Sequence, residues 1–220
     1  IGLVINDLRN PFFTEFAASA QMSFASHGYA TVIANTDEDP AVQARVIASM
    51  IEHGVSGFLI SPTYVDEPLA LENVRRAGVP AMQVLRRIDA RTDIFPFASL
   101  DYVAGGRLAT RHLIGQGARR IAFIGGFDDR PVTRERMAGH LEVMGAAGLA
   151  PTAFHGRPSR AFGRDIALRL AATRPGIEAA ICFSDLVALG MLAGFAEAGV
   201  VVGDRFRLVG FDDIEECALT

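Results

Sequence analysis

The chain has 220 residues, 50% of them hydrophobic, and a formal net charge of −4 at pH 7. This length can bury the core of one or two domains, and the acidic balance excludes a basic nucleic-acid-binding module. No apolar run reaches the roughly 18 residues of a membrane span. Cys182 and Cys217 are expected to be reduced, mostly buried thiols, which fits a cytoplasmic protein; a disulfide or a metal pair is the less favoured alternative.

The chain begins with a strand followed by a polar turn and a helix start. Asn10 suits the N-cap position and Pro11 the first helical position. In an open α/β sheet, ligands bind outside the carboxyl ends of the strands. We therefore expect the polar and aromatic side chains after this strand to face a ligand: Asn6, Asp7, Phe12 and Phe13. Polar groups beside aromatic rings suit a sugar, whose hydroxyls need acceptors and whose ring faces are apolar.

Apolar runs and helical stripes alternate along the whole chain. Strands are predicted at residues 2–5, 29–34, 57–61, 81–85, 97–100, 120–124, 179–183 and 208–211, with a weaker one at 152–155. Helical stripes fall within residues 13–24, 42–51, 108–117, 166–171 and 186–196. This alternation is typical of parallel βαβ units, and the continuous apolar strands indicate a sheet covered on both faces. We expect two similar halves, residues 1–99 and 100–220.

Sequence motifs of the common enzyme classes are missing. The sequence has no GxxxxGKS/T, GxSxG, HExxH or CxxC, and no GxGxxG follows a strand. The five histidines are scattered, so a ligand or catalytic role for any of them is not favoured. We therefore expect a protein that is not an enzyme and that uses no cofactor and no metal.

Four further polar sites follow predicted strands. They are Arg86-Arg87, the segment from Arg130 to Arg136, Ser184-Asp185 and Asp212-Asp213. All of them could converge on one cleft, where an arginine fork and a carboxylate together can hold adjacent hydroxyls. The plainer alternative is a helix N-cap for Asp185 or Asp213, and a solvated surface charge for a single arginine.

Three arginines in this predicted cleft raise the question of the ligand's charge: Arg86, Arg130 and Arg136. They could suit a sugar acid or a sugar phosphate, because charge-assisted hydrogen bonds are stronger than neutral ones. In the competing interpretation, one of the first two pairs with Asp7, Asp101 or Asp128, and the site suits a neutral sugar.

Several segments, in order and spacing, resemble the effector-binding core of lactose-repressor (LacI/GalR) family transcription regulators. They are Asn10-Pro11-Phe12-Phe13, Asn35 to Pro40, Gly54 to Phe58, Leu100 to Arg107, Arg119 to Gly126, Arg136 to Gly139, Ser184 to Gly190 and Val209 to Asp213. The resemblance covers essentially the whole chain. It implies two Rossmann-like three-layer α/β subdomains of the periplasmic-binding-protein type, residues 1–99 and 100–220, with a sugar-sized ligand between them.

The resemblance also implies site residues by position. The ligand contacts would be Phe12, Phe13, Arg130, Arg136 and Asp212, with Asn6, Asp7, Arg86 and Asp185 as further candidates. Relatives continue with a crossover to the first subdomain and a final strand and helix, so we expect that a C-terminal segment is missing from these 220 residues.

The function implied is that of a ligand-responsive transcription regulator, usually a repressor. Its expected partners are a carbohydrate effector, a second copy in a homodimer, and operator DNA bound through an N-terminal helix-turn-helix outside these residues. The effector would shift the population between two angles of the subdomains, which differ in DNA affinity. A sugar-binding periplasmic receptor of an ABC transporter is the alternative; the Gly210–Asp213 turn and the Arg136–Gly139 segment favour the regulator.

Overall fold

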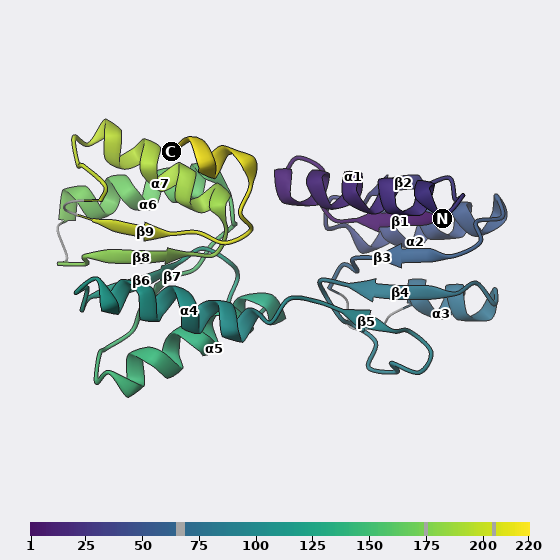
Figure 1. Ribbon diagram of the computed structural model, residues 1–220, viewed down its shortest axis with the longest axis horizontal. Helices are drawn as coiled ribbons and strands as arrows, with labels where there is room; N and C mark the ends of the chain where they lie inside the picture. Colours follow the sequence, from purple (N-terminus) through teal and green to yellow (C-terminus); the bar gives the residue numbers. More distant parts are fainter. Residues whose placement is uncertain (65–68, 174–175, 204–205) are drawn as a thin grey trace. The chain divides into compact units, whose positions relative to one another are not determined.

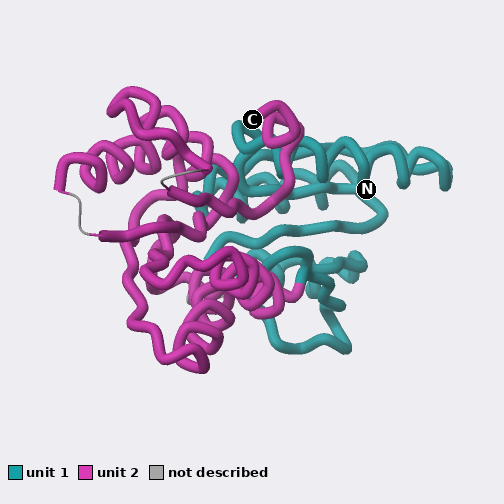
Figure 2. The backbone as a smooth tube through the Cα atoms, turned by 60° about the vertical axis from the view of Figure 1, so that its left-hand side comes forward, with its two compact units in different colours: residues 1–100 teal, residues 101–220 magenta. Residues whose placement is uncertain are grey.

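The computed structural model describes residues 1–64, 69–173, 176–203 and 206–220. The chain forms two compact units, residues 1–100 and 101–220 (Figure 2). Each unit is built on its own parallel sheet (Figure 1). Within the described ranges, no helix combines the length and the hydrophobicity that a membrane span requires.

The first unit contains a five-stranded parallel sheet in the order β2-β1-β3-β4-β5. Its strands are β1 (Gly2–Ile5), β2 (Val32–Asn35), β3 (Phe58–Ile60), β4 (Ala81–Val84) and β5 (Phe97–Ala98). Its helices are α1 (Pro11–Ser26), α2 (Pro40–Glu52) and α3 (Leu69–Arg76). Asn10 caps α1 and Asp39 caps α2, each by accepting from a free backbone N–H, and each is followed by proline.

Both faces of this sheet are covered by helices. Successive strand residues point to opposite faces, so β1 contributes to two separate clusters. Leu3 and Ile5 pack with Phe13 of α1. On the other side, one cluster joins Val4 to α2 and α3 through residues such as Ile47 and Leu71. The result is a three-layer α/β unit. The loops that carry the predicted ligand contacts follow the carboxyl ends of its strands.

Strand β2 departs from the prediction of a sheet buried on both faces. The strand begins at Val32, not at residue 29, and its residues Val32 and Ile33 are 52% and 40% exposed. β2 lies at the edge of the sheet and pairs only with β1 among the described strands. Its apolar composition therefore does not come from burial within this unit.

The second unit contains a four-stranded parallel sheet in the order β7-β6-β8-β9. Its strands are β6 (Ile121–Ile124), β7 (Thr152–Phe154), β8 (Ala179–Cys182) and β9 (Arg207–Val209). Its helices are α4 (Tyr102–Gly115), α5 (Pro131–Ala146), α6 (Arg160–Thr173), α7 (Asp185–Glu197) and the 3₁₀ helix η1 (Glu215–Leu219). Helices α4 and α5 cover one face and α6 and α7 the other.

Glycines bring α4 and α5 into close backbone contact. A Cβ atom added to Gly106 of α4 would lie 2.1 Å from the carbonyl oxygen of Arg136 in α5. A Cβ atom added to Gly139 of α5 would lie 2.1 Å from the carbonyl oxygen of Val103 in α4. Only glycine permits this approach, and the approach fixes the backbone position of Arg136.

Candidate functional site

In the first unit, Asn6 lies where β1 ends and is fully buried. Its side-chain oxygen accepts a hydrogen bond from the Ser61 hydroxyl at 2.5 Å, and its amide nitrogen donates to the Pro62 carbonyl at 3.4 Å. Asn6 therefore ties the end of β1 to the segment that follows β3. Its amide group is already engaged within the protein.

Asp7 is also engaged by neighbouring groups. Its carboxylate accepts from the backbone N–H of Arg9 at 3.0 Å and from the Arg9 Nε at 2.9 Å. The same guanidinium pairs with Asp37 in the turn after β2. Arg9 thus connects the loops that follow β1 and β2.

The two phenylalanines at the start of α1 have different surroundings. Phe13 is buried against the sheet, whereas Phe12 is half-buried at the edge of the same cluster. Their ring centroids lie 5.3 Å apart at an interplanar angle of 72°, an edge-to-face arrangement. Phe12 is the better placed of the two for contact with a ligand.

Arg86 follows β4 and forms a two-pronged ion pair with Glu38. Its Nη1 and Nη2 donate to the two carboxylate oxygens of Glu38 at 2.7 and 2.8 Å. The guanidinium carbon also lies 4.9 Å from the ring centroid of Tyr64. The neutral interpretation expects Asp7, Asp101 or Asp128 as the partner. Glu38 pairs with Arg86 instead, because the loops after β2 and β4 meet at the carboxyl edge of the sheet.

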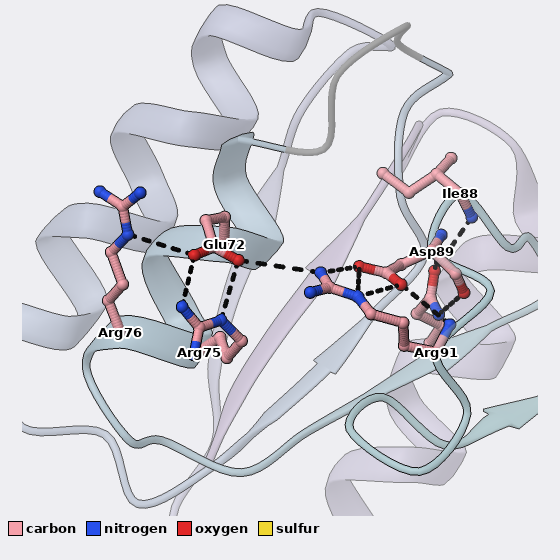
Figure 3. A network of polar contacts seen from close by, with 7 residues as sticks. Glu72, Arg75, Arg76, Ile88, Asp89 and Arg91 are labelled. Atoms are coloured by element: carbon pink, nitrogen blue, oxygen red, sulfur yellow. Dashed lines mark hydrogen bonds and ion pairs between the residues drawn. The ribbon is translucent and has the colours of Figure 1, made fainter.

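A network of polar contacts holds the loop that carries Arg86 (Figure 3). Gln83 of β4 donates to the carbonyl of Asp89 and accepts from its backbone N–H. Arg91 donates to the Asp89 carboxylate at 2.5 Å and lies 3.8 Å from Glu72 of α3. Hydrogen bonds from Arg75 are the main cause that lowers the pKa of Glu72 to about 2. The loop after β4 is therefore anchored both to its own strand and to α3.

In the second unit, a buried ion pair joins Arg136 to Asp212. Nη2 of Arg136 donates to the Asp212 carboxylate at 3.2 Å, and the two side chains are only 6% and 7% exposed. Nη1 donates to the carbonyl oxygen of Phe183. The guanidinium also lies 4.5 to 5.0 Å from the ring centroids of Phe211, Phe183 and Tyr102. These rings and partners hold the arginine in one orientation.

The carboxyl groups of Asp212 and of nearby Asp185 both have raised pKa values. Burial is the main cause that raises the pKa of Asp212 to about 6, and the Arg136 charge opposes this shift. Burial also raises the pKa of Asp185, while a hydrogen bond that it accepts from the backbone N–H of Ile214 at 3.0 Å acts the other way. Ser184, not Asp185, takes the N-cap position of α7, so the N-cap interpretation of Asp185 is wrong.

A hollow of about 780 Å³ lies beside β9 within this unit. Asp185 and Asp212 line it together with Cys217, His112 of α4 and Leu189 of α7. Phe211 and Asp212, which both contact the Arg136 guanidinium, also line the hollow, whereas Arg136 itself does not. Carboxylate oxygens in a hollow of this kind can accept hydrogen bonds from hydroxyl groups.

Arg130 occupies a different position from Arg136. It takes the N-cap position of α5, is 44% exposed, and lies 3.6 Å from Asp129, the residue next to it. This surface contact leaves Arg130 accessible at the carboxyl edge of the second sheet.

Each predicted residue therefore lies at the carboxyl edge of its own sheet. The prediction missed the groups that hold these residues: Glu38, Ser61, Tyr64, Tyr102, Phe183 and Phe211. Glu38 could have been found by applying the strand-end rule to β2, which it follows by three residues. Over the ranges that the structure describes, no three His, Cys, Asp or Glu side chains cluster as metal ligands would.

Comparisons with known proteins identify relatives over nearly the whole chain. The family model described as periplasmic binding proteins and sugar binding domain of LacI family matches residues 1–216. The ribose operon repressor of Halalkalibacterium halodurans is 28% identical over 214 residues, 97% of this chain and 62% of that protein. The ribose operon repressor of Escherichia coli K12 is 29% identical over 219 residues, 98% of this chain and 66% of that protein. The chain thus spans slightly less than two thirds of the length of these curated relatives.

Solved structures agree on the architecture. The transcription regulator GntR from Chromobacterium violaceum superposes with a TM-score of 0.88 at 25% identity, covering 100% of this chain and 80% of that chain. A LacI family regulator from Enterococcus faecium with bound ribose gives a TM-score of 0.89 at 21% identity, again over 100% of this chain and 80% of that one. These neighbours confirm the predicted fold class of two parallel α/β subdomains.

Proposed function

The chain belongs to the family of periplasmic binding proteins and LacI-type sugar-binding domains. We therefore propose that it is the effector-binding core of a ligand-responsive transcription regulator, usually a repressor. The observation that carries the proposal is the similarity, over 97% and 98% of the chain, to two proteins named as repressors. No catalytic reaction is proposed for it. A regulator of this kind acts on chromosomal DNA, and hence in the cytoplasm.

We propose a carbohydrate as the effector, because polar groups and one accessible aromatic ring lie at the carboxyl edges of the two sheets. The proposed contact residues are Asn6, Asp7, Phe12, Phe13, Arg86, Arg130, Arg136, Asp185 and Asp212. Phe12 offers an apolar surface to a sugar ring, and Asp212 and Asp185 offer acceptors for hydroxyls. Neutral ligands in related structures support this class: ribose in one regulator and cellobiose in another, which is 26% identical.

The proposed partners of the whole protein are operator DNA and a second copy of the chain. DNA half-sites related by two-fold symmetry call for a homodimer. Four large exposed apolar residues on or next to α1 and β2 support an interface there: Met22, Tyr29, Val32 and Ile33. Sedimentation velocity of the full-length protein at micromolar concentration should show a dimer, and a monomer alone would count against it.

Regulation in this proposal is a population shift. The effector changes DNA affinity only as far as it binds the DNA-competent and DNA-incompetent states with different affinities. The alternative, a periplasmic receptor, shares the fold with a solute-binding protein from Actinobacillus succinogenes at 16% identity and a TM-score of 0.84. The relatives in sequence named above are repressors, which favours the regulator.

Calorimetric titration of the full-length protein with a panel of neutral sugars, sugar acids and sugar phosphates tests the effector assignment. Phe12→Leu should weaken binding of the best sugar about tenfold, since the contact between an aromatic ring and a sugar face is lost. Phe24→Leu is the matched control, because Phe24 is also half-buried on α1 but lies near its other end. If both variants bind the sugar like the wild type, the assigned site is wrong.

A further inference from the structure

The turn between β2 and α2 holds two consecutive acidic residues in an unusual backbone conformation. Asp37 and Glu38 have φ values of 50° and 63°, in the left-handed region that side chains other than glycine rarely adopt. Each of the two carboxylates holds an arginine from another loop. Asp37 pairs with Arg9 after β1, and Glu38 pairs with Arg86 after β4.

The backbone on the arginine side of the Arg86–Glu38 pair is strained as well. Leu85, immediately before Arg86, has a φ of 64°, and the Arg86 N–H donates to the Val84 carbonyl at 2.6 Å. A hydrogen bond across a single residue with positive φ is typical of the classic γ-turn, which is rare and strained. Backbone strain of this kind persists where surrounding contacts enforce it, and it clusters at ligand sites. Both ends of the Arg86–Glu38 pair therefore lie in strained turns.

The pair spans the part of the sheet where the proposed effector contacts lie. Strands β2 and β4 flank β1 and β3 in the sheet order β2-β1-β3-β4-β5. A contact between the loops after β2 and β4 must therefore cross the carboxyl ends of β1 and β3, where Asn6 and Ser61 are buried. The Arg86 side chain is only 16% exposed, whereas Glu38 is 47% exposed. Solvent screens this pair less than it would screen a fully exposed one.

We propose that Glu38 acts as the internal counter-carboxylate of Arg86 and thereby makes this edge selective for uncharged polyhydroxyl ligands over anionic ones. This inference rests on the proposed function, since it assumes that the effector binds at this edge. A phosphate or carboxylate group must displace Glu38 to take the two hydrogen bonds that Nη1 and Nη2 of Arg86 make with it, whereas a hydroxyl group can bind beside the intact pair. The two-pronged geometry makes that displacement costly, because charge-assisted bidentate pairs are the strong ones.

The test compares anion binding by full-length variants in calorimetry, with inorganic phosphate, D-ribose and D-ribose 5-phosphate as probes. Glu38→Gln keeps the side-chain size and removes the charge. It should bind phosphate about tenfold more tightly than the wild type, as expected for one charge-assisted contact. Relative to D-ribose, it should also bind D-ribose 5-phosphate more tightly than the wild type does, by a similar factor.

Two controls assign the gain to this pair. Glu52→Gln makes the same charge change on the exposed end of α2 and should leave phosphate binding unchanged. The double variant Glu38→Gln/Arg86→Gln should return phosphate binding to the wild-type level. If Glu38→Gln folds poorly, Glu38→Asn serves instead, since asparagine tolerates the left-handed backbone at this position.

Several results would overturn the inference. They are equal phosphate binding by the wild type and Glu38→Gln, an equal gain in Glu52→Gln, a gain that survives in the double variant, and a wild type that prefers D-ribose 5-phosphate to D-ribose. Failure of the proposed function gives a different result: no sugar of the wider panel binds the wild type. The phosphate comparison between variants remains readable in that case, because it needs no sugar.

Discussion

The buried Asp212 carboxylate makes stability depend on pH in a definite direction. Burial raises its pKa to about 6 from the ordinary value of 3.8. Between these two pH values the folded protein takes up a proton that the unfolded chain does not. Lowering the pH from about 6 to about 4 therefore increases the free energy of unfolding through this group, by up to ~3 kcal/mol. Asp212→Asn lacks this contribution.

The measurement is urea unfolding of the wild type and Asp212→Asn at several pH values between 7 and 4. Burial lowers the pKa of His140 to about 4. As the pH falls towards 4, the unfolded chain binds a proton at this histidine before the folded protein does, which lowers the free energy of unfolding. His140 is present in both proteins, and the difference between their free energies of unfolding removes its effect. A difference that does not change with pH would show that Asp212 does not titrate in this range.

At the scale of elements, the contact between α4 and α5 positions the arginine of the second unit. Gly106→Ala places a Cβ atom 2.1 Å from the Arg136 carbonyl oxygen, so the two helices must move apart. We expect the free energy of unfolding to fall by about 2 kcal/mol, a typical cost of overpacking. Gly115→Ala, in the same helix but with open space around the added Cβ atom, should be neutral or slightly stabilising. Equal stability of both variants in urea unfolding would refute this role for Gly106.

Strand and helix positions could be predicted from sequence where one local signal was strong. The helix starts at Asn10-Pro11 and Asp39-Pro40 are local, since the side chain caps the helix and proline fits its first position. Every predicted strand exists, but all except the first are one or two residues shorter than expected. The eight-residue helix α3 was missed because it is shorter than the window of roughly 11 residues over which helical periodicity is recognised. The exposure of β2 depends on what lies beyond the sheet edge, which strand composition does not reveal.

The sequence indicated where the candidate residues lie along the chain, but not which residues they pair with. The strand-end rule predicted polar residues after β4 and β9, and Arg86 and Asp212 do follow those strands. Arg136 lies on α5, and only its guanidinium reaches the residues that follow β8 and β9. Which carboxylate each arginine takes depends on strand order, because the order decides which loops meet. The strand order brings Glu38 to Arg86, although the two are 48 residues apart in sequence.

In the full-length protein, we expect a sugar bound by this core to control DNA binding. The most direct test uses the full-length protein, with a duplex selected from a random DNA library by the protein itself. Fluorescence anisotropy then measures its DNA affinity with and without a saturating concentration of the best sugar from the calorimetric panel. We expect the sugar to change the DNA affinity by at least about fivefold, in either direction, as is typical for coupling between two sites. A sugar that binds tightly but leaves DNA affinity unchanged, or a full-length protein that selects no duplex, would contradict it.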